Sequence, residues 1–362
     1  MSKPEKLQRM PAEHKFREEL ERLAAEDTHA VPPGWRMSPI AVEQFILGDP
    51  DRGIRRKFVS EPGLVRRMII SLCTNRGSLL IGEPGTAKSW LSELVCAAIS
   101  ADSSLTIQGG SVSEINQLLY GWNDAIRNEK GPVPEALVPA PFYRAMAEGK
   151  LVRFEEISRC PQSLQDAILA IISDRIIVIP EIEGEAGVVV AREGFNVIAT
   201  SNSVDEGVFK MSAALKRRLN YETIQPIRRV KDEIDVVMHE LEGLNARSGV
   251  ETPPDPAVIE VLVTIFHELR SGQSLDGRST HRLASASMST AEAVNVAHAM
   301  SVHAWYYEGG AMKPEHLVHF LVGSALKDEP EDRARLRQYF DTELARRDGE
   351  HWQQVYAHRH LI

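Results

Sequence analysis

Apolar and polar positions between residues 60 and 230 repeat a strand, loop, helix pattern. Four short apolar runs are predicted to be strands, at residues 78–81, 105–107, 151–154 and 195–200. Between the first two runs, Leu91, Leu94, Val95 and Ala98 have the i, i+3, i+4, i+7 spacing of one helix face. Residues 164–172 form a second such face. Strands that alternate with helices predict an α/β fold with a parallel sheet.

Two further patterns flank the last predicted strand. Residues 176–191 hold two β-rich runs around a Glu/Gly turn, which favours a hairpin inserted into the core. After about residue 230 the strand signals end. Asp255 precedes Pro256 as an N-cap precedes a first-turn proline, and Pro314 and Pro330 are predicted to open two further helices. The last third of the chain is therefore predicted to be helical.

Residues 11–25 carry a thin apolar stripe among many charges, which is compatible with a docking arm or with a frayed helix. Together the patterns predict three regions. Residues 1–59 form an N-terminal helical arm and linker, residues 60–229 a core, and residues 230–362 a helical lid with C-terminal helices.

Composition narrows the functional classes. The 362 residues are 43% hydrophobic and 26% charged, as in ordinary globular proteins, and no apolar run approaches a membrane span. The N-terminus lacks the apolar segment of a secretory signal, so we expect a cytoplasmic protein without a membrane partner. Cys73, Cys96 and Cys160 are too widely spaced for a zinc motif, and Cys96 is expected to be a small buried hydrophobe.

Charge and histidine spacing give weaker indications. The net charge of −9 disfavours a nucleic-acid partner, and the basic stretch at 52–57 fits a solvated surface better than an anion site. His316 with His319, and His358 with His360, have near-ligand spacing. Because neither pair has a third ligand motif beside it, we expect surface or interface histidines.

An octapeptide at residues 82–89 has the spacing of a phosphate-binding loop, and it follows a predicted strand and opens a predicted helix. Its residues are Gly82, Glu83, Pro84, Gly85, Thr86, Ala87, Lys88 and Ser89. Backbone N–H groups would cradle ATP phosphates, Lys88 would reach the β- and γ-phosphates, and Ser89 would bind Mg²⁺. Ala87 replaces the second glycine of the general pattern. We expect the loop to keep its shape if Ala87 has a negative φ.

Glu155 and Glu156 end the apolar run that begins at Leu151. In a P-loop enzyme the first acid holds Mg²⁺ and the second polarises the attacking water. Neighbouring strand side chains point to opposite faces, so one acid can face the metal and the other the γ-phosphate. Glu155 stands where aspartate is usual, and Arg153 interrupts the run, so we expect one face there to be incompletely buried. Without the loop upstream, two exposed acids after an edge strand would fit equally well.

Five segments resemble the MoxR family of AAA+ ATPases over roughly residues 60–300. They are GEPGTAKS at 82–89, IQGGSVSEINQLLYG at 107–121, PAPFYRAMAEGKLVRFEEISRCP at 139–161, FNVIATSNS at 195–203 and ALKRRL at 214–219. The resemblance implies an AAA+ αβα core with a parallel sheet and hairpin insertions, followed by a helical lid domain. Alanine before the lysine is common in that family.

The resemblance also implies roles for three residues. Asn202 resembles the sensor that hydrogen-bonds the attacking water or the γ-phosphate. Arg218, with Arg217 as the runner-up, resembles the arginine finger offered to the neighbouring subunit. From the residues alone, Asn202 is also a common turn residue at a strand end, and a basic pair also suits a helix end.

The family's sensor arginine at the start of a lid helix is missing from residues 287–293. Ser289 and Glu292 have capping-box spacing there, and this explains the segment without a catalytic role. Arg278 or Arg282 could replace the sensor arginine.

These expectations define a function. The resemblance implies a Mg²⁺-dependent, ring-forming ATPase, a homo-hexamer that remodels or chaperones a partner with a von Willebrand factor A domain. One alternative is the motor subunit of a magnesium or cobalt chelatase. The other is a nucleotide-gated binding module with little turnover, to which Glu155 and the missing lid arginine give weight.

Overall fold

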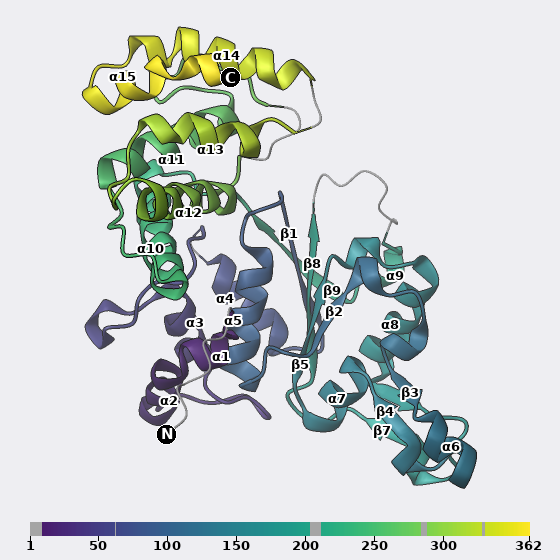
Figure 1. The fold of residues 1–362 in the computed structure, drawn as a ribbon. Coiled ribbons are helices and arrows are strands. Elements are labelled where there is room, and N and C mark those ends of the chain that lie inside the picture. Colours follow the sequence, from purple (N-terminus) through teal and green to yellow (C-terminus); the bar gives the residue numbers. More distant parts are fainter. Residues whose placement is uncertain (1–8, 62, 203–210, 284–287, 328–329) are drawn as a thin grey trace. The chain divides into compact units, whose positions relative to one another are not determined.

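The structure is a computed structural model that describes residues 9–61, 63–202, 211–283, 288–327 and 330–362. It divides into two compact units (Figure 1). The sheet unit contains residues 9–82 and 87–224, and the helical unit contains residues 83–86 and 225–362. Each unit is described by itself. The predicted three-region division stays a prediction, although residues 9–59 lie in the sheet unit.

The centre of the sheet unit is a parallel sheet, in which the described part of the chain supplies five strands in the order β2-β5-β8-β1-β9. The strands are β1 (Gly77–Gly82), β2 (Thr106–Gln108), β5 (Leu151–Glu155), β8 (Asn196–Asn202) and β9 (Leu219–Ile224). Every neighbouring pair is parallel. The predicted parallel α/β fold is confirmed, and four of these strands match the predicted runs. The edge strand β9 was not predicted.

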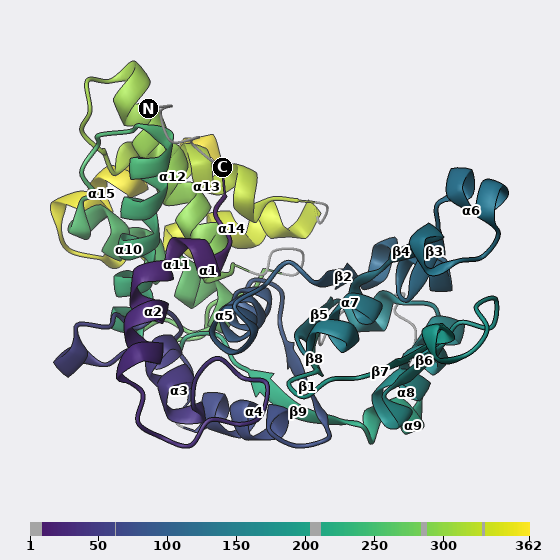
Figure 2. The ribbon, with the colours of Figure 1, turned by 90° about the horizontal axis from the view of Figure 1, so that it is seen from below.

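Helices cover both faces of this sheet (Figures 1 and 2). They are α1 (Ala12–Lys15), α2 (Arg17–Glu26), α3 (Pro39–Leu47), α4 (Leu64–Leu72), α5 (Lys88–Ser100), α7 (Pro141–Glu148), α8 (Gln162–Asp174) and α9 (Ala213–Lys216). A further helix, α6 (Asp124–Lys130), has no buried residue and lies away from the sheet (Figures 1 and 2). Because strand side chains alternate, Leu80 and Ile198 join the core under α1–α5. Leu79 and Ala199 join the opposite core with α7 and α8.

The N-terminal stripe forms a docked arm within the described residues. Leu20 and Leu23 of α2 are fully buried in the core that includes α3 and α5, and the Phe16 ring lies 5.7 Å from the Phe45 ring. Cys96 is also buried in this core, as expected of a small hydrophobe.

Two hairpins extend from the core. β6 (Ile176–Val178) pairs antiparallel with β7 (Val188–Val190), which confirms the hairpin predicted at 176–191. β3 (Tyr120–Trp122) pairs antiparallel with β4 (Leu137–Pro139), and α6 lies between them in the sequence. This second hairpin was not predicted, because its three-residue strands carry no sustained apolar alternation.

Among its described residues, the helical unit packs six α-helices around one apolar core, and a helical last third of the chain was predicted from the sequence. They are α10 (Val230–Ser248), α11 (Pro256–Ser271), α12 (Thr290–Tyr307), α13 (Glu315–Ala325), α14 (Pro330–Thr342) and α15 (Glu350–Ala357). Asp255 caps α11 by accepting from the N–H groups of Ala257 and Val258. Among the described helices, none is both long enough and apolar enough to pass through a membrane.

Candidate functional site

The phosphate loop connects the carboxyl end of β1 to the first residue of α5. Lys88 begins α5, is only 7% exposed, and donates from Nζ to the Gly82 carbonyl oxygen at 3.0 Å. Gly85 and Ala87 both have positive φ, 76° and 63°. The expectation that Ala87 keeps a negative φ is therefore wrong. The chain enters α5 through a left-handed residue, which explains why glycine is the general choice at this position.

Glu155, the last residue of β5, lies at the centre of a buried polar cluster. Its Oε2 accepts from Ser89 Oγ at 2.6 Å and from Thr200 Oγ1 at 2.7 Å, and its Oε1 accepts from Ser92 Oγ at 2.7 Å. Desolvation by burial pushes the pKa of Glu155 up, but the hydrogen bonds from Ser89, Ser92 and Thr200 and the nearby Arg153 outweigh it and hold the pKa below the ordinary value. This carboxylate is therefore ionised while it is only 2% exposed.

Arg153 supplies the positive charge that this cluster needs. Its guanidinium donates to Glu155 Oε1 at 3.0 Å, to Ser92 Oγ at 3.1 Å, and to the carbonyl oxygens of Ser89 at 3.0 Å and Ser103 at 3.1 Å. Arg153 is 8% exposed and every residue of β5 is buried. The expectation of an incompletely buried face is therefore wrong, because four acceptors compensate the buried charge.

Glu156 does not continue the strand. β5 ends at Glu155, and Glu156 is left-handed with φ 53° and ψ 48°. The strand-alternation argument therefore does not apply to it. Its backbone N–H donates to Thr200 Oγ1 at 3.0 Å, and its carboxylate, 39% exposed, lies 3.1 Å from Arg159 Nε.

A glycine directly after the neighbouring strand β2 permits this turn. Gly109 follows β2, and a Cβ placed on it would lie 2.2 Å from the Glu156 carbonyl oxygen. Only a residue without a side chain fits this close approach. The sequence contained this signal in the IQGG segment, but nothing in it pointed to Glu156 as the neighbour.

Asn202 is the last residue of β8 and is the ladder partner of Gly82 on β1. The structure therefore places the predicted sensor beside the first residue of the phosphate loop. Thr200, two residues earlier, contacts both acids and was missed by the sequence reasoning. Ser92, one turn into α5, was also missed. Each looks like an ordinary strand or helix residue in the sequence.

Arg217 and Arg218 lie away from this cluster. Both are exposed after α9, and Arg218 Nε donates to Ser173 Oγ at 3.2 Å. Leu219, the next residue, pairs with Gly77 at the amino end of β1, whereas the phosphate loop leaves the carboxyl end. Five strand steps, roughly 17 Å, separate the two ends. The structure does not bring this arginine pair to the loop of its own chain.

The start of α12 shows the predicted capping box. Ser289 Oγ accepts from the Glu292 N–H at 3.3 Å, and the Glu292 carboxylate accepts from the Ser289 N–H at 2.8 Å. Two arginines are possible substitutes for the sensor arginine, and each forms an ion pair within the helical unit. Arg278 Nη2 lies 2.8 Å from Glu343 Oε2. Arg282 Nη2 lies 3.3 Å from Glu83 Oε1. Residues 284–287 lie outside the described residues.

Comparison with known proteins matches two family models to separate parts of the chain. A family model described as an AAA domain of the dynein-related subfamily matches residues 77–219, and a model described as the YehL-like AAA+ ATPase C-terminal domain matches residues 231–362. The uncharacterized protein YehL of Escherichia coli K12 is 48% identical over 356 residues, which cover 98% of each chain. The chain belongs to the YehL-like family of AAA+ ATPases.

More distant relatives of this YehL-like ATPase match only part of its sequence, or share its fold at low sequence identity. The uncharacterized protein SH1500 of Staphylococcus haemolyticus is 26% identical over 58% of this chain and 74% of its own. The ADP complex of NtrX from Brucella abortus aligns with a TM-score of 0.50 at 11% identity, over 83% of this chain and 64% of NtrX. At this identity NtrX shows the AAA+ fold alone. None of these matches names the MoxR family.

The residues of the YehL-like site fit a magnesium ion. Mg²⁺ prefers hard oxygen ligands, and it is usually held by one or two protein oxygens together with water and phosphate. Ser89 Oγ and Glu155 Oε2 are two such oxygens, and they already lie 2.6 Å apart. Glutamate at position 155 reaches the serine despite its extra methylene, because Arg153 holds the other carboxylate oxygen.

Proposed function

We propose that the chain hydrolyses ATP with Mg²⁺ in a cytoplasmic ring, a homo-hexamer that remodels a protein partner as MoxR-like ATPases do. One observation carries the hydrolysis proposal. The hydroxyl of Ser89 at the start of α5 and the carboxylate of Glu155 at the end of β5 are hydrogen-bonded at 2.6 Å, 66 residues apart in the sequence. This contact joins the phosphate loop to the acid strand in the arrangement that P-loop ATPases use.

Each site residue has a role in this proposal. Lys88 and the loop N–H groups hold the phosphates at the positive end of α5. Ser89 and Glu155 hold Mg²⁺, which neutralises charge on the phosphoryl oxygens when it is bound. Glu156 accepts a proton from, or orients, the attacking water, and Asn202 hydrogen-bonds that water or the γ-phosphate. Arg218 of one subunit, or else Arg217, stabilises the charge that develops in its neighbour's site.

Support for a partner protein is indirect. The resemblance to the MoxR family implies a partner with a von Willebrand factor A domain. The NtrX complexes with ADP and ATP support nucleotide binding by a chain of this fold and concern no partner protein. Identification of proteins that co-purify with Glu156→Gln in the presence of ATP tests this part of the proposal. A co-purifying protein without such a domain contradicts the partner class and leaves the ATPase proposal standing.

A nucleotide-gated binding module is the second candidate. The observation that favours it is the ion pair between Glu156 and Arg159 at 3.1 Å, which occupies the carboxylate needed to activate water. If this pair persists with ATP bound, the chain binds nucleotide and turns it over slowly. Steady-state phosphate release separates the two candidates.

Three variants test the hydrolysis proposal together. Lys88→Ala should abolish the ATP-dependent thermal shift, whereas ATP at one hundred times Kd should stabilise the wild type by about 2.7 kcal/mol. Glu156→Gln should keep the shift and lose phosphate release. Glu155→Gln should raise the Mg²⁺ concentration required for activity. A preserved shift in Lys88→Ala would show that the loop is not the nucleotide site. If Glu155→Gln, not Glu156→Gln, binds ATP normally and stops turnover, the two acids have the opposite roles.

A further inference from the structure

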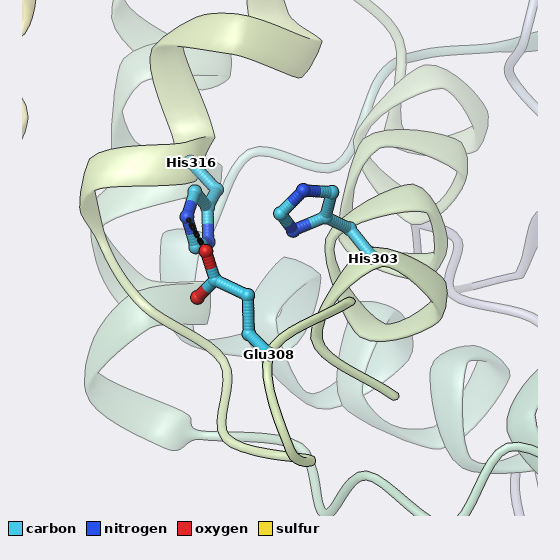
Figure 3. A group of neighbouring side chains, drawn as sticks. All are labelled: His303, Glu308 and His316. Carbon is cyan, nitrogen blue, oxygen red and sulfur yellow. Dashed lines mark ion pairs between the residues drawn. The ribbon is translucent and has the colours of Figure 1, made fainter. Parts of the chain in front are cut away.

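Three ligand-type side chains of the helical unit converge on one point (Figure 3). They are His303 near the end of α12, Glu308 directly after that helix, and His316 in the first turn of α13. One ligand atom from each lies within 4.8 Å of the other two. Within the part of the chain that the structure describes, no other group of three such residues meets this spacing.

The contacts inside this cluster are short and directed. His316 Nε2 lies 3.0 Å from Glu308 Oε1, and the imidazole centroids of His303 and His316 are 4.6 Å apart. His303 is held by an almost parallel stack on Tyr307, with an angle of 19° between the rings, and by an edge contact with Phe320. These aromatic contacts restrict the rotation of His303, so its ring is pre-positioned for a ligand.

Two imidazole nitrogens of the cluster lack a hydrogen-bond partner among the described residues. They are His303 Nδ1 and His316 Nδ1, and both atoms are buried. Buried polar atoms are nearly always paired, and a bound ion is one of the ordinary explanations for an exception. A metal ion bound to either nitrogen would satisfy it.

Two histidines and one glutamate form a ligand set that suits zinc. A tetrahedral Zn²⁺ with bonds of about 2.0–2.2 Å keeps its ligand atoms roughly 3.3 Å apart, close to the Glu308–His316 distance. Glu315 Oε1 lies 3.8 Å from His316 Nε2 and is therefore near enough to serve as a further ligand or to hydrogen-bond a bound water. Imidazole nitrogens favour transition metals, whereas Mg²⁺ and Ca²⁺ favour sites made only of oxygens.

Lys313 competes for the same carboxylate. Its Nζ lies 2.8 Å from Glu308 Oε2. Without a metal ion, Glu308 is therefore held by Lys313 and by His316. A metal ion must displace or share this contact, so Lys313 provides a means of testing the assignment.

We propose that His303, Glu308 and His316 bind one divalent transition-metal ion of the zinc class and thereby tie the end of α12 to the start of α13. The site is separate from the proposed Mg²⁺ ligands Ser89 and Glu155, and it does not depend on the chain being an ATPase. The segment between the two helices includes Gly309 and Gly310, both with positive φ. A bound ion would therefore cross-link the two ends of this turn.

Equilibrium dialysis of the untagged full-length chain against Zn²⁺, with Mg²⁺ in excess and without nucleotide, tests the proposal. We expect one Zn²⁺ per chain that Mg²⁺ does not displace. Co²⁺ should bind at the same stoichiometry and give visible absorption bands that Zn²⁺ removes. His303→Ala, His316→Ala and Glu308→Gln should each weaken binding at least 10-fold, since even loss of a supporting group typically costs 10–100-fold.

Two variants serve as controls. His319→Ala removes an exposed histidine from the same helix, α13, and should bind Zn²⁺ as the wild type does. Lys313→Met should tighten Zn²⁺ binding, because the competing cation is gone. Melting curves without metal verify that each variant is folded, and Glu308→Gln preserves side-chain shape if an alanine variant fails to fold. The proposal is overturned if no Zn²⁺ binds, or if folded cluster variants bind as much as His319→Ala does.

Discussion

At the residue scale, Ala87 adopts a backbone conformation that most side chains avoid. Its φ of 63° and ψ of 28° lie in the left-handed region, directly before Lys88. For a residue with a Cβ this region costs roughly 1–2 kcal/mol, whereas glycine enters it freely. The loop therefore holds Ala87 in a backbone conformation that is most strained for β-branched side chains.

The first prediction concerns this position. Ala87→Gly should leave ATP affinity and stability almost unchanged, because relief of the left-handed strain is offset by about 0.4–1 kcal/mol of added freedom in the unfolded chain. Ala87→Val should weaken ATP binding at least 10-fold, because β-branched residues at positive φ are severely strained. Isothermal titration with ATP measures both. Equal affinity of the valine variant would mean that the left-handed turn is not needed for binding.

A second residue-scale prediction follows from the ionised state of Glu155. Removing one partner of a buried ion pair typically costs 3–5 kcal/mol, so Glu155→Gln should melt below the wild type at pH 7 because Arg153 remains buried. The native pKa of Glu155 is depressed below 4.5, so its stabilisation is complete above that pH and is lost as pH falls through the native pKa. The difference in melting temperature should therefore shrink on acidification.

Melting curves between pH 7 and the acid limit of the fold, without Mg²⁺ and nucleotide, measure this difference. Glu156→Gln is the matched control, because its carboxylate is 39% exposed and its pair with Arg159 is of the surface type that contributes little. A pH-independent difference between the wild type and Glu155→Gln would contradict the assignment of an ionised Glu155 in the cluster.

At the element scale, the sequence predicts elements well where burial follows a simple period. Strands β1, β5 and β8 lie at the predicted apolar runs, because parallel central strands are covered on both faces. The edge strand β2 lies at the fourth run, where Leu105 and Ile107 are buried. The edge strand β9 mixes exposed and buried residues in LNYETI, with Tyr221 40% exposed, so it lacks that signal.

Arg153 was misjudged for a different reason. A charge in a strand normally marks exposure, but its acceptors come from Ser89, Ser92 and Ser103, 50 to 64 residues earlier. Only the pairing of β2 with β5 and the packing of α5 bring these acceptors together. The candidate site could therefore be listed residue by residue from motifs, whereas its charge balance required the fold.

The element-scale prediction concerns the turn after β5. Gly109→Ala should impair the Glu156 turn, because the new Cβ would lie 2.2 Å from the Glu156 carbonyl oxygen and backbone would have to move. Gly110→Ala is the matched control, since its Cβ would meet only Arg159 side-chain atoms at 3.6 Å and beyond. We expect Gly109→Ala to lower the melting temperature and to reduce phosphate release at least 10-fold. If the two variants behave alike, the close approach is not a constraint on the acid turn.

At the scale of the whole molecule, sheet order determines which residues one chain can bring to its own phosphate loop. Glu155 and Asn202 are the last residues of β5 and β8, so both lie at the carboxyl edge of the sheet, where Asn202 pairs with Gly82. Arg218 precedes β9 and therefore lies at the amino edge, next to Gly77. An arginine at that edge can reach a phosphate loop only if the loop belongs to another subunit.

The last prediction tests this requirement for a second subunit. Arg218→Ala should bind ATP normally and lose hydrolysis by roughly 10³-fold or more, as expected for an arginine finger. Wild-type activity per chain should rise steeply with protein concentration, because each site is completed by its neighbour.

Lys88→Ala has a defective pocket and an intact finger, and Arg218→Ala has the reverse, so neither variant forms an active site alone. In a ring with head-to-tail interfaces assembled from equal amounts of both, about one interface in four joins an intact pocket to an intact finger. Mixing the two inactive variants should therefore restore phosphate release to a substantial fraction of the wild-type rate. The same mixture with Arg217→Ala in place of Arg218→Ala identifies which arginine is required. If mixed rings form and stay inactive with both arginine variants, while wild-type activity is independent of concentration, the ring-enzyme proposal fails and the binding-module alternative is preferred.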